Sequence, residues 1–474
     1  MADIAALYRD TDAVGLAQLV KRREVSPLEL LDAALARVEE TQPAFNYIVR
    51  LFPHRARRRA AGPLPDGPLA GVPFLVKDLG IDVAGEISGM GSRSMRYTPD
   101  WNSILVERAD AAGLLTFGKT TTPELGLTIT TESAATGQTR NPWDPTRIAG
   151  GSSGGAAVAV AVGAVPLAQA SDGGGSIRVP ASCCGLLGLK TSRGLVPHGP
   201  KLETMWNGMA VSGPIARTAR DCAAFLDMLA GPAPGTRAAP PVPGGGWLAN
   251  LESAPRPLRV ALLDAPITGT PVDPEVSAAL AAAARQIEAM GHVVEPAQPA
   301  IDWPALMAAN ITNIAVCTAA DIEQFRLAQG RDPGDGLEPA VANWRRMGLE
   351  RGGLAHELAL RALEAACIAL DRFFETHDII LSPTLAEPPI ELGILSLSNP
   401  DHQQFIETYT RFCPYVGLAN MTGTPAITLP LGHSRSNLPI GIMAHGRFGS
   451  DLTLLQLAHQ LERASPWATR RPPV

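Results

Sequence analysis

The chain has 474 residues, of which 46% are hydrophobic and 18% are charged, and its formal net charge is −6. The apolar share is ordinary for a globular protein with a large core. Its one basic run, residues 55–59 (RARRR), is more typical of a solvated helix face than of a nucleic-acid footprint. No stretch of about 18 uninterrupted apolar residues occurs. We therefore expect neither a nucleic-acid partner nor a membrane partner.

The six cysteines and nine histidines also exclude some classes of protein. There is no C-x-x-C, H-x-x-x-H or H-x-E pattern, so we expect no metal site and no cofactor. Six cysteines in a chain of this length do not make a disulfide scaffold. The first residues lack a basic start followed by an apolar run, so no signal peptide is evident. These features favour the reducing cytoplasm as the location of the protein.

The first predicted elements are a helix and a buried strand. Residues 26–29 (SPLE) form a capping box with proline at the first helical position, and apolar residues recur at helical spacing up to Val38. Residues 71–78 (GVPFLVKD) contain a short apolar run that is typical of a buried strand. Helix-like and strand-like segments then alternate, which predicts an α/β layered fold.

The clearest linker begins at residue 231 and extends to about 257, with a Pro/Gly-rich stretch at 231–246. Residues 300–376 have helical spacing and carry no recognisable motif, whereas strand-like segments return at 378–384 and 424–430. Because strands occur on both sides of the linker, we expect both halves to build one sheet. The predicted organisation is a single domain over residues 1–474.

Two glycine-serine segments stand apart from ordinary loops: residues 150–155 (GGSSGG) and residues 172–178 (DGGGSIR). Glycines let the backbone approach a ligand closely, and consecutive N–H groups form a concavity for negative charge. A serine at its end is placed for nucleophilic attack beside an oxyanion hole. The alternative is that the segments are flexible tethers. Flexible tethers are flanked by polar sequence, whereas both of these segments adjoin apolar stretches.

These two segments, in this order and spacing, resemble the signature of the amidase signature family, and residues 71–78 resemble the lysine motif of that family. Further similar segments continue to the end of the chain: 140–144 (RNPWD), 185–190 (GLLGLK), 213–217 (GPIAR), 423–426 (GTPA) and 438–441 (LPIG). The resemblance covers residues 25–230 and 378–465. It implies a large, mixed, mostly parallel twisted sheet with helices on both faces. Within the family, the sequence is loosely similar to hydrolases of the 6-aminohexanoate cyclic dimer.

The resemblance also implies a role for each matching residue. Ser176 is the expected nucleophile, Ser152 the bridging serine after a cis peptide bond, and Lys77 the terminal base. The backbone N–H groups of the expected oxyanion hole belong to Gly173, Gly174, Gly175 and Ser176. The residues expected to support the loop, the last two as an ion pair, are Ser153, Asp172 and Arg178. The family often has threonine or a branched residue where this chain has Gly173.

The chemistry agrees with this assignment. A serine hydroxyl needs an adjacent base, and no histidine lies near either glycine segment, which makes a Ser-Lys arrangement the natural alternative. Lysine has a reference pKa of about 10.4, so a basic role requires burial or a nearby cation. Lys77 follows a strand-like apolar run, which is consistent with burial.

Two other functions compete with this prediction. Residues 113–120 (GLLTFGKT) match the P-loop pattern letter for letter, but the four intervening residues are bulky and strand-like, which disfavours nucleotide binding. A glutaminase-type subunit that feeds ammonia to a partner is the second alternative, because some family members act in that way. It would require an obligate complex, whereas the main prediction needs only a monomer or homodimer.

The expected substrates are small hydrophobic amides, linear or cyclic, and carbamate or ester bonds fit the same chemistry. Residues 121–138 and 300–376 are expected to line the pocket, with Leu127, Thr128 and Ile129 as named candidates. Further apolar candidates, each also readable as plain core, are Leu125, Trp206, Met209 and Phe325. Cys317 is best interpreted as an inert buried thiol.

Overall fold

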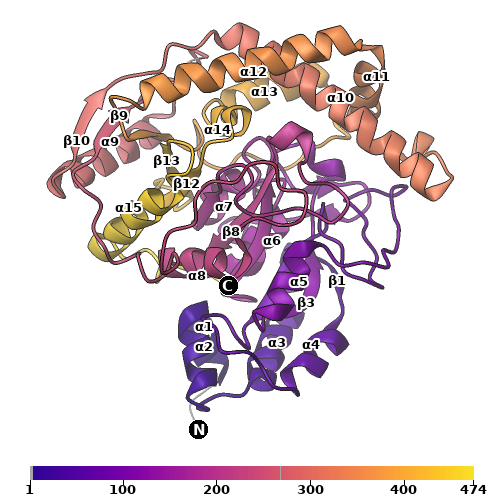
Figure 1. Ribbon diagram of the computed structural model, residues 1–474, viewed down its shortest axis with the longest axis vertical. Helices are drawn as coiled ribbons and strands as arrows, with labels where there is room; N and C mark the ends of the chain where they lie inside the picture. The colour runs from indigo at the N-terminus through magenta and orange to yellow at the C-terminus, as the bar shows by residue number, and fades with distance from the viewer. Residues whose placement is uncertain (1–3, 267) are drawn as a thin grey trace.

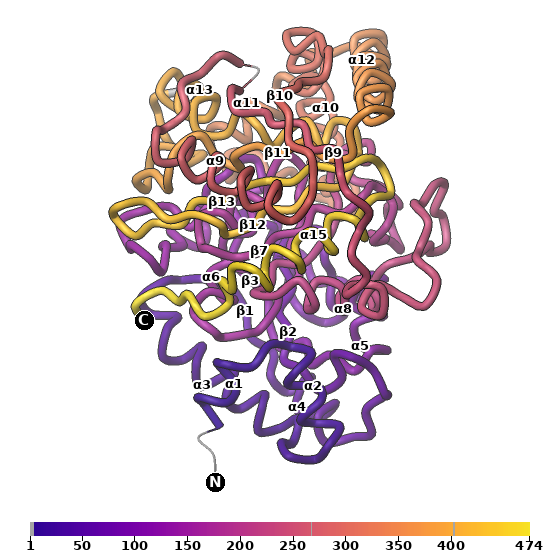
Figure 2. Tube along the Cα trace, turned by 90° about the vertical axis from the view of Figure 1, so that its left-hand side faces the viewer, coloured from indigo at the N-terminus to yellow at the C-terminus, as the bar shows by residue number. Residues whose placement is uncertain are grey.

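The structure, a computed structural model, describes residues 4–266 and 268–474. A large sheet runs through the molecule, with the N-terminal helices at one end and the helices of residues 303–373 at the other (Figures 1 and 2). The predicted α/β class, with a large mixed sheet covered by helices, is confirmed.

Within the described residues, the main sheet has eleven strands. Their order from edge to edge is β1 (Ile48–Leu51), β3 (Leu115–Thr120), β2 (Pro73–Lys77), β6 (Leu167–Asp172), β8 (Val211–Ala216), β7 (Leu187–Lys190), β12 (Ala426–His433), β13 (Pro439–Gly446), β11 (Ile379–Pro383), β9 (Arg259–Leu262) and β10 (Val293–Pro296). Strands from both sides of the linker share this sheet, as predicted. A separate pair consists of β4 (Glu132–Ser133) and β5 (Gly137–Gln138).

The strand directions correct one detail of the prediction. The pairs β3–β2, β2–β6, β11–β9 and β9–β10 are parallel, but every neighbouring pair from β6 to β11 across the centre is antiparallel. The sheet is therefore mixed, as expected, but it is not mostly parallel. The short connection between β12 and β13 shows one reason, since strands joined by a tight turn must run antiparallel.

The helices flank the sheet and extend beyond it. Their bounds are α1 (Ile4–Asp10), α2 (Ala13–Lys21), α3 (Pro27–Phe45), α4 (Pro53–Ala60), α5 (Ile104–Ala111), α6 (Gly154–Ala161), α7 (Arg178–Cys184), α8 (Ala219–Leu229), α9 (Pro274–Ala289), α10 (Trp303–Gln329), α11 (Pro339–Glu350), α12 (Gly353–Phe373), α13 (His402–Phe412), α14 (Gly417–Thr422) and α15 (Asp451–Ala464), with 3-10 turns η1 (Glu124–Gly126), η2 (Trp206–Gly208) and η3 (Gly334–Gly336). The capping box at Ser26 is present at the start of α3.

Two large hydrophobic cores form on the two faces of the sheet. Along β11, Ile379 and Leu381 belong to one core and Ile380, between them, belongs to the other. Along β9, Val260 and Ala261 divide in the same way. Because successive side chains of a strand point to opposite faces, this alternation shows that both faces are covered.

The linker is irregular, as predicted, but it is anchored to the body of the molecule. No helix or strand interrupts residues 231–257. Trp247 and Leu251 from this segment are nevertheless buried in the first core. The segment therefore packs against the sheet layers and does not hang free as a tether.

The P-loop pattern is overturned by the structure. Residues Leu115–Thr120 of the pattern form the fully buried strand β3, and Lys119 forms a buried ion pair with Asp78. A phosphate-binding loop needs exposed backbone N–H groups between a strand and a helix. The nucleotide-binding alternative therefore has no site here.

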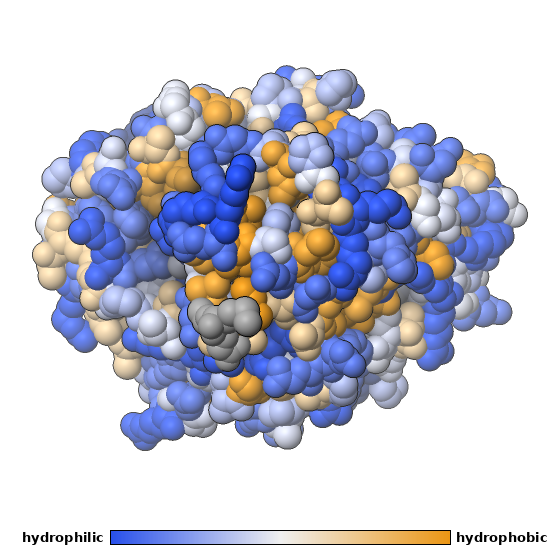
Figure 3. Space-filling view, turned by 90° about the horizontal axis from the view of Figure 1, so that it is seen from below, coloured by the Kyte–Doolittle hydropathy of each residue, from blue (hydrophilic) through white to orange (hydrophobic). Residues whose placement is uncertain are grey.

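Helix α10 is long and apolar for a reason that is visible in its contacts. Among the described residues, α10 alone has the length and composition to cross a bilayer, and 44% of its most apolar window is buried. It packs against α11 and α12, and several of its apolar side chains line a cavity. The outer surface is more polar than this helix: the face of the molecule at the N-terminal end is largely hydrophilic, with smaller hydrophobic areas among the hydrophilic ones (Figure 3).

Candidate active site

Lys77 is the last residue of β2, a strand in which all five residues are buried. Its backbone N–H donates to Gln169 Oε1 on the neighbouring strand β6 at 2.8 Å. Its side-chain Nζ donates to Ser152 Oγ at 2.7 Å and to Ser171 Oγ at 3.1 Å. The expected burial of Lys77 is confirmed, because the residue is 0% exposed.

The surroundings of Lys77 shift its protonation. Burial lowers the pKa of Lys77 to about 7, although the Asp172 carboxylate acts in the opposite direction. The cause is the poor solvation of an ammonium ion in a low-dielectric interior. Within the described residues, no carboxylate forms an ion pair with Lys77. Near neutral pH a large fraction of the side chain is therefore a neutral amine, which accepts a proton.

The GGSSGG segment leads directly into α6 and contains the expected cis peptide bond, between Gly151 and Ser152. A side chain at Gly151 would have no space, since its Cβ would overlap the carbonyl oxygen of Thr130. Ser153 joins this segment to the second one: its N–H donates to Ser176 O at 3.2 Å, and its Oγ donates to Ser171 O at 3.1 Å. These two hydrogen bonds join the segments, which is the contact that the predicted supporting role of Ser153 requires.

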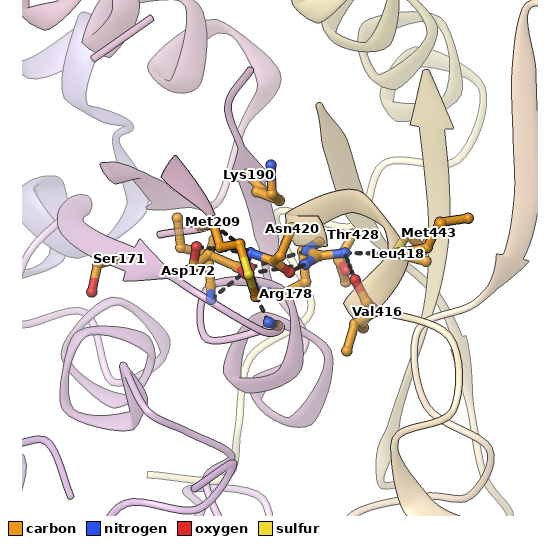
Figure 4. A network of polar contacts seen from close by, with 12 residues as sticks. Ser171, Asp172, Arg178, Lys190, Met209, Val416, Leu418, Asn420, Thr428 and Met443 are labelled. Atoms are coloured by element: carbon orange, nitrogen blue, oxygen red, sulfur yellow. Dashed lines mark hydrogen bonds and ion pairs between the residues drawn. The ribbon is translucent and has the colours of Figure 1, made fainter. Parts of the chain in front are cut away.

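The expected ion pair between Asp172 and Arg178 is present and completely buried (Figure 4). Arg178 Nε and Nη2 each donate to a carboxylate oxygen of Asp172 at 3.0 Å. Asn420 on α14 also donates to Asp172 and accepts from Arg178 at 2.6 Å. Burial raises the pKa of Asp172, but the Arg178 guanidinium outweighs it and holds that pKa well below its usual range. The carboxylate is therefore ionised at any working pH.

The Asp172 carboxylate also accepts hydrogen bonds from the glycine segment, and one of these comes from a predicted donor of the oxyanion hole. The N–H of Gly175 donates to Asp172 Oδ1 at 2.7 Å, and the N–H of Ile177 donates to Oδ2 at 3.0 Å. The N–H of Gly175 is thus already committed, so its predicted place in the oxyanion hole is wrong in this structure. Those of Gly173, Gly174 and Ser176 have no acceptor within the described chain.

Ser152 and Ser176 open onto a cavity of about 820 Å³ together with Gly173 and Gly174. Their hydroxyls do not hydrogen-bond to each other in this structure. The volume falls in the range of sites for small organic molecules. The lining is mainly apolar, and it includes all three named candidates, Leu127, Thr128 and Ile129.

The other pocket expectations are only partly confirmed. Leu125, Trp206 and Phe325 line the cavity, but Met209 does not; it is buried in the second core. Helices α10 and α11 contribute to the wall, as expected, whereas α12 packs behind α10 and does not reach it. Cys317 is not on the wall, and burial raises its thiol pKa to about 12, which agrees with an inert thiol.

Several site residues were missed by the sequence analysis. The cavity wall also includes parts of residues 79–103, 198–205 and 396–410. Ser171 directly precedes the second glycine segment, so its position in the sequence could have indicated that it belongs to the site. Asn420 and Asp321 had no such signal, because they belong to no motif and reach the site only through the packing of α14 and α10.

Comparison with known proteins agrees with the fold and the site. The sequence matches the Amidase family over residues 29–455. It is 36% identical to the 6-aminohexanoate-cyclic-dimer hydrolase of Pseudomonas sp. (strain NK87), over 97% of this chain and 96% of that protein. A solved 6-aminohexanoate cyclic dimer hydrolase superposes with a TM-score of 0.93 at 35% identity, covering 100% of this chain and 99% of the other. A bacterial aryl acylamidase of the amidase signature family gives a TM-score of 0.86 at 28% identity, with 97% of both chains covered. The chain therefore belongs to the amidase family, whose members are hydrolases of carbon–nitrogen amide bonds.

Proposed function

We propose that this amidase cleaves small hydrophobic amides, linear or cyclic, through an acyl-enzyme on Ser176, with Ser152 and Lys77 as its proton relay. The observation that carries the proposal is the 2.7 Å contact between a fully buried Lys77 Nζ and Ser152 Oγ. A buried lysine with a pKa of about 7 is suited to general base work at neutral pH.

In the first half of the reaction, Ser176 Oγ attacks the carbonyl carbon of the substrate. Its proton passes to Ser152 Oγ, and the Ser152 proton passes to the neutral amine of Lys77. When the carbon–nitrogen bond breaks, the relay runs in reverse and protonates the leaving nitrogen. A water molecule then attacks the acyl-enzyme by the same steps and regenerates Ser176.

The charge that develops on the substrate oxygen needs donors that are held in place before the reaction. We assign this role to the N–H groups of Gly173, Gly174 and Ser176, which have no other acceptor among the described residues. The Asp172–Arg178 pair fixes the turn that presents them. Removing one such donor from an enzyme typically slows turnover by about 10²–10³-fold.

The mainly apolar wall supports hydrophobic substrates. The similarity to hydrolases named for a cyclic dimer of 6-aminohexanoate supports linear and cyclic amides in particular. The same relay and oxyanion hole would serve a carbamate or an ester, so we include both in the proposed range. No observation favours the glutaminase-type subunit. The six cysteines are free thiols, which supports the proposed cytoplasmic location.

The test is a panel of chromogenic anilides, carbamates and esters with hydrophobic acyl groups, assayed with the wild type and with Ser176→Ala. We expect the wild type to cleave anilides and the variant to lose activity by about 10⁴-fold or more. Ser396→Ala is the matched control, because Ser396 lines the same cavity away from the glycine segments, and it should retain its rate. Equal activity of the wild type and Ser176→Ala would overturn the proposal.

A further inference from the structure

Helix α10 brings one carboxylate, that of Asp321, to the wall of the cavity. Met307, Ile311, Ile314, Thr318 and Asp321 recur at helical spacing along this helix and all line the cavity. The first three are apolar, and Phe325 and Ala328 continue the same face beyond Asp321, so the carboxylate lies within an apolar stripe. The amide side chains of α10 that also reach the wall are those of Asn310, Gln324 and Gln329. A carboxylate in such a stripe is expensive to desolvate unless it binds a partner.

Asp321 has spare capacity to accept hydrogen bonds. Within residues 4–266 and 268–474, no lysine or arginine forms an ion pair with it. Burial raises its pKa to about 6, and a hydrogen bond with the Trp206 side chain acts in the opposite direction. The other carboxylate on the cavity wall, Asp82, differs because it already accepts from Tyr97 and Ser88.

Trp206 relates Asp321 to the reaction centre. The edge of its indole ring fills the space beside Gly173, where a Cβ would lie 2.9 Å from Trp206 Cζ3. The same side chain reaches Asp321. The indole ring therefore lies between Asp321 and the glycine segment that carries Ser176, and all three line the same cavity.

The position of Trp206 is fixed by its backbone. Trp206 and Asn207 both have left-handed φ angles, 50° and 53°. Asn313 on α10 holds this turn: its Nδ2 donates to Trp206 O at 3.2 Å, and its Oδ1 accepts from Asn207 Nδ2 at 2.6 Å. The helix that carries Asp321 thus also holds the turn that carries Trp206, which keeps the two side chains in register.

A second polar atom lies one helical turn before the carboxylate. Thr318 is 1% exposed, and its hydroxyl has no hydrogen-bond partner. Thr318 and Asp321 are three residues apart and therefore lie on the same side of α10. This end of the cavity wall thus combines an acceptor with spare capacity and an unsatisfied hydroxyl.

We propose that Asp321 is a specificity-determining residue that binds an N–H or ammonium group of the substrate, remote from the bond that is cleaved. The substrates that it selects are amides with a second nitrogen donor, such as an ω-amino group or a second amide. This inference rests on the proposed amide hydrolysis, since it concerns which amides the same cavity accepts.

The test compares substrates that differ only in an ammonium or a methyl group. For the acyl side these are 6-aminohexanoyl and heptanoyl p-nitroanilide; for the amine side they are the hexanoyl amides of 1,6-diaminohexane and n-heptylamine. We expect Asp321→Asn to lower kcat/KM about tenfold or more for the ammonium member of at least one pair, because a hydrogen bond to a charged group is lost. The methyl members should stay within about twofold.

Asp82→Asn is the matched control and should leave the ratio within each pair unchanged. A ratio that Asp321→Asn also leaves unchanged in both pairs would overturn the inference. Calorimetric titration of Ser176→Ala with n-hexylammonium tests it without turnover: binding should disappear when Asp321→Asn is added, and equal binding would overturn it. Hydrolysis that survives Ser176→Ala would instead refute the proposed function, so the two failures are distinguishable.

Discussion

The reaction centre and the cavity wall of this amidase are built in opposite ways. The centre consists of short segments at the ends of β2 and β6 and at the start of α6, and its polar groups are joined by many hydrogen bonds, as around Asp172. The wall comes from distant helices and loops, and one of its two carboxylates, Asp321, has few partners, although the other, Asp82, is hydrogen-bonded to Tyr97 and Ser88. From this difference we expect the reaction to depend on groups that the protein holds in place, and selectivity to depend on a group that is left free for the substrate. Four predictions test this contrast.

The largest expected effect is at Lys77. Lys77→Met removes the amine that we propose as the acceptor of the Ser152 proton, so we expect kcat to fall by about 10³-fold or more on every substrate. The methionine is apolar and of similar length, so thermal unfolding should change little. Steady-state kinetics and a melting curve check both statements. A loss of kcat that differs between substrates would instead indicate that Lys77 contributes to selectivity, as the cavity wall does.

The next effect concerns the buried pair. Asp172→Asn leaves Arg178 as an uncompensated buried charge, so we expect the free energy of unfolding to fall by about 3–5 kcal/mol. Urea denaturation measures this change. Asp371→Asn, which breaks an exposed pair with Arg447, is the control and should have no measurable effect. Similar stability of the two variants would mean that the centre is not held by this pair.

The third prediction is a pH dependence. Because burial lowers the pKa of Lys77 to about 7, the amine is neutral above this pH and protonated below it. We expect kcat/KM to be level above pH 7 and to fall about tenfold per pH unit below it. The pKa of Lys190 is also lowered to about 7, chiefly by burial, but its Nζ donates to the backbone carbonyls of Thr191 and Thr424. Lys190→Met should therefore keep the same acidic limb, and its disappearance would transfer the limb to Lys190.

The smallest effect tests a place where the reaction centre and the cavity wall are in contact, at Gly173 and Trp206. A methyl group added by Gly173→Ala would lie 2.9 Å from the Trp206 ring, so one of the two must move. Overpacking of this kind costs about 1–3 kcal/mol, and we expect the activation free energy that corresponds to kcat to rise by a similar amount. Trp206→Phe should restore part of the rate in the double variant, since it removes the opposing ring edge. A double-mutant cycle measures the coupling, and strict additivity would contradict the contact.

This contact also explains a departure of the sequence from the pattern that it resembles. The family often has threonine or a branched residue where this chain has Gly173. Sequence reasoning could note the difference, but it gave no cause for it. The structure supplies the cause: Trp206 occupies the volume that a side chain at Gly173 would need.

The sequence by itself determined the parts whose signal is local. The buried strand before Lys77, the two glycine-serine segments and the Asp172–Arg178 pair all lie within short motifs, and backbone requirements for glycine are legible there. Only the tertiary structure decided that the N–H of Gly175 is committed to Asp172, that Met209 lies in the core and that Asp321 faces the cavity. The physical reason is that a hydrogen-bond partner or a cavity wall is a property of chain segments far apart in sequence. Their approach is set by packing, which no local pattern records.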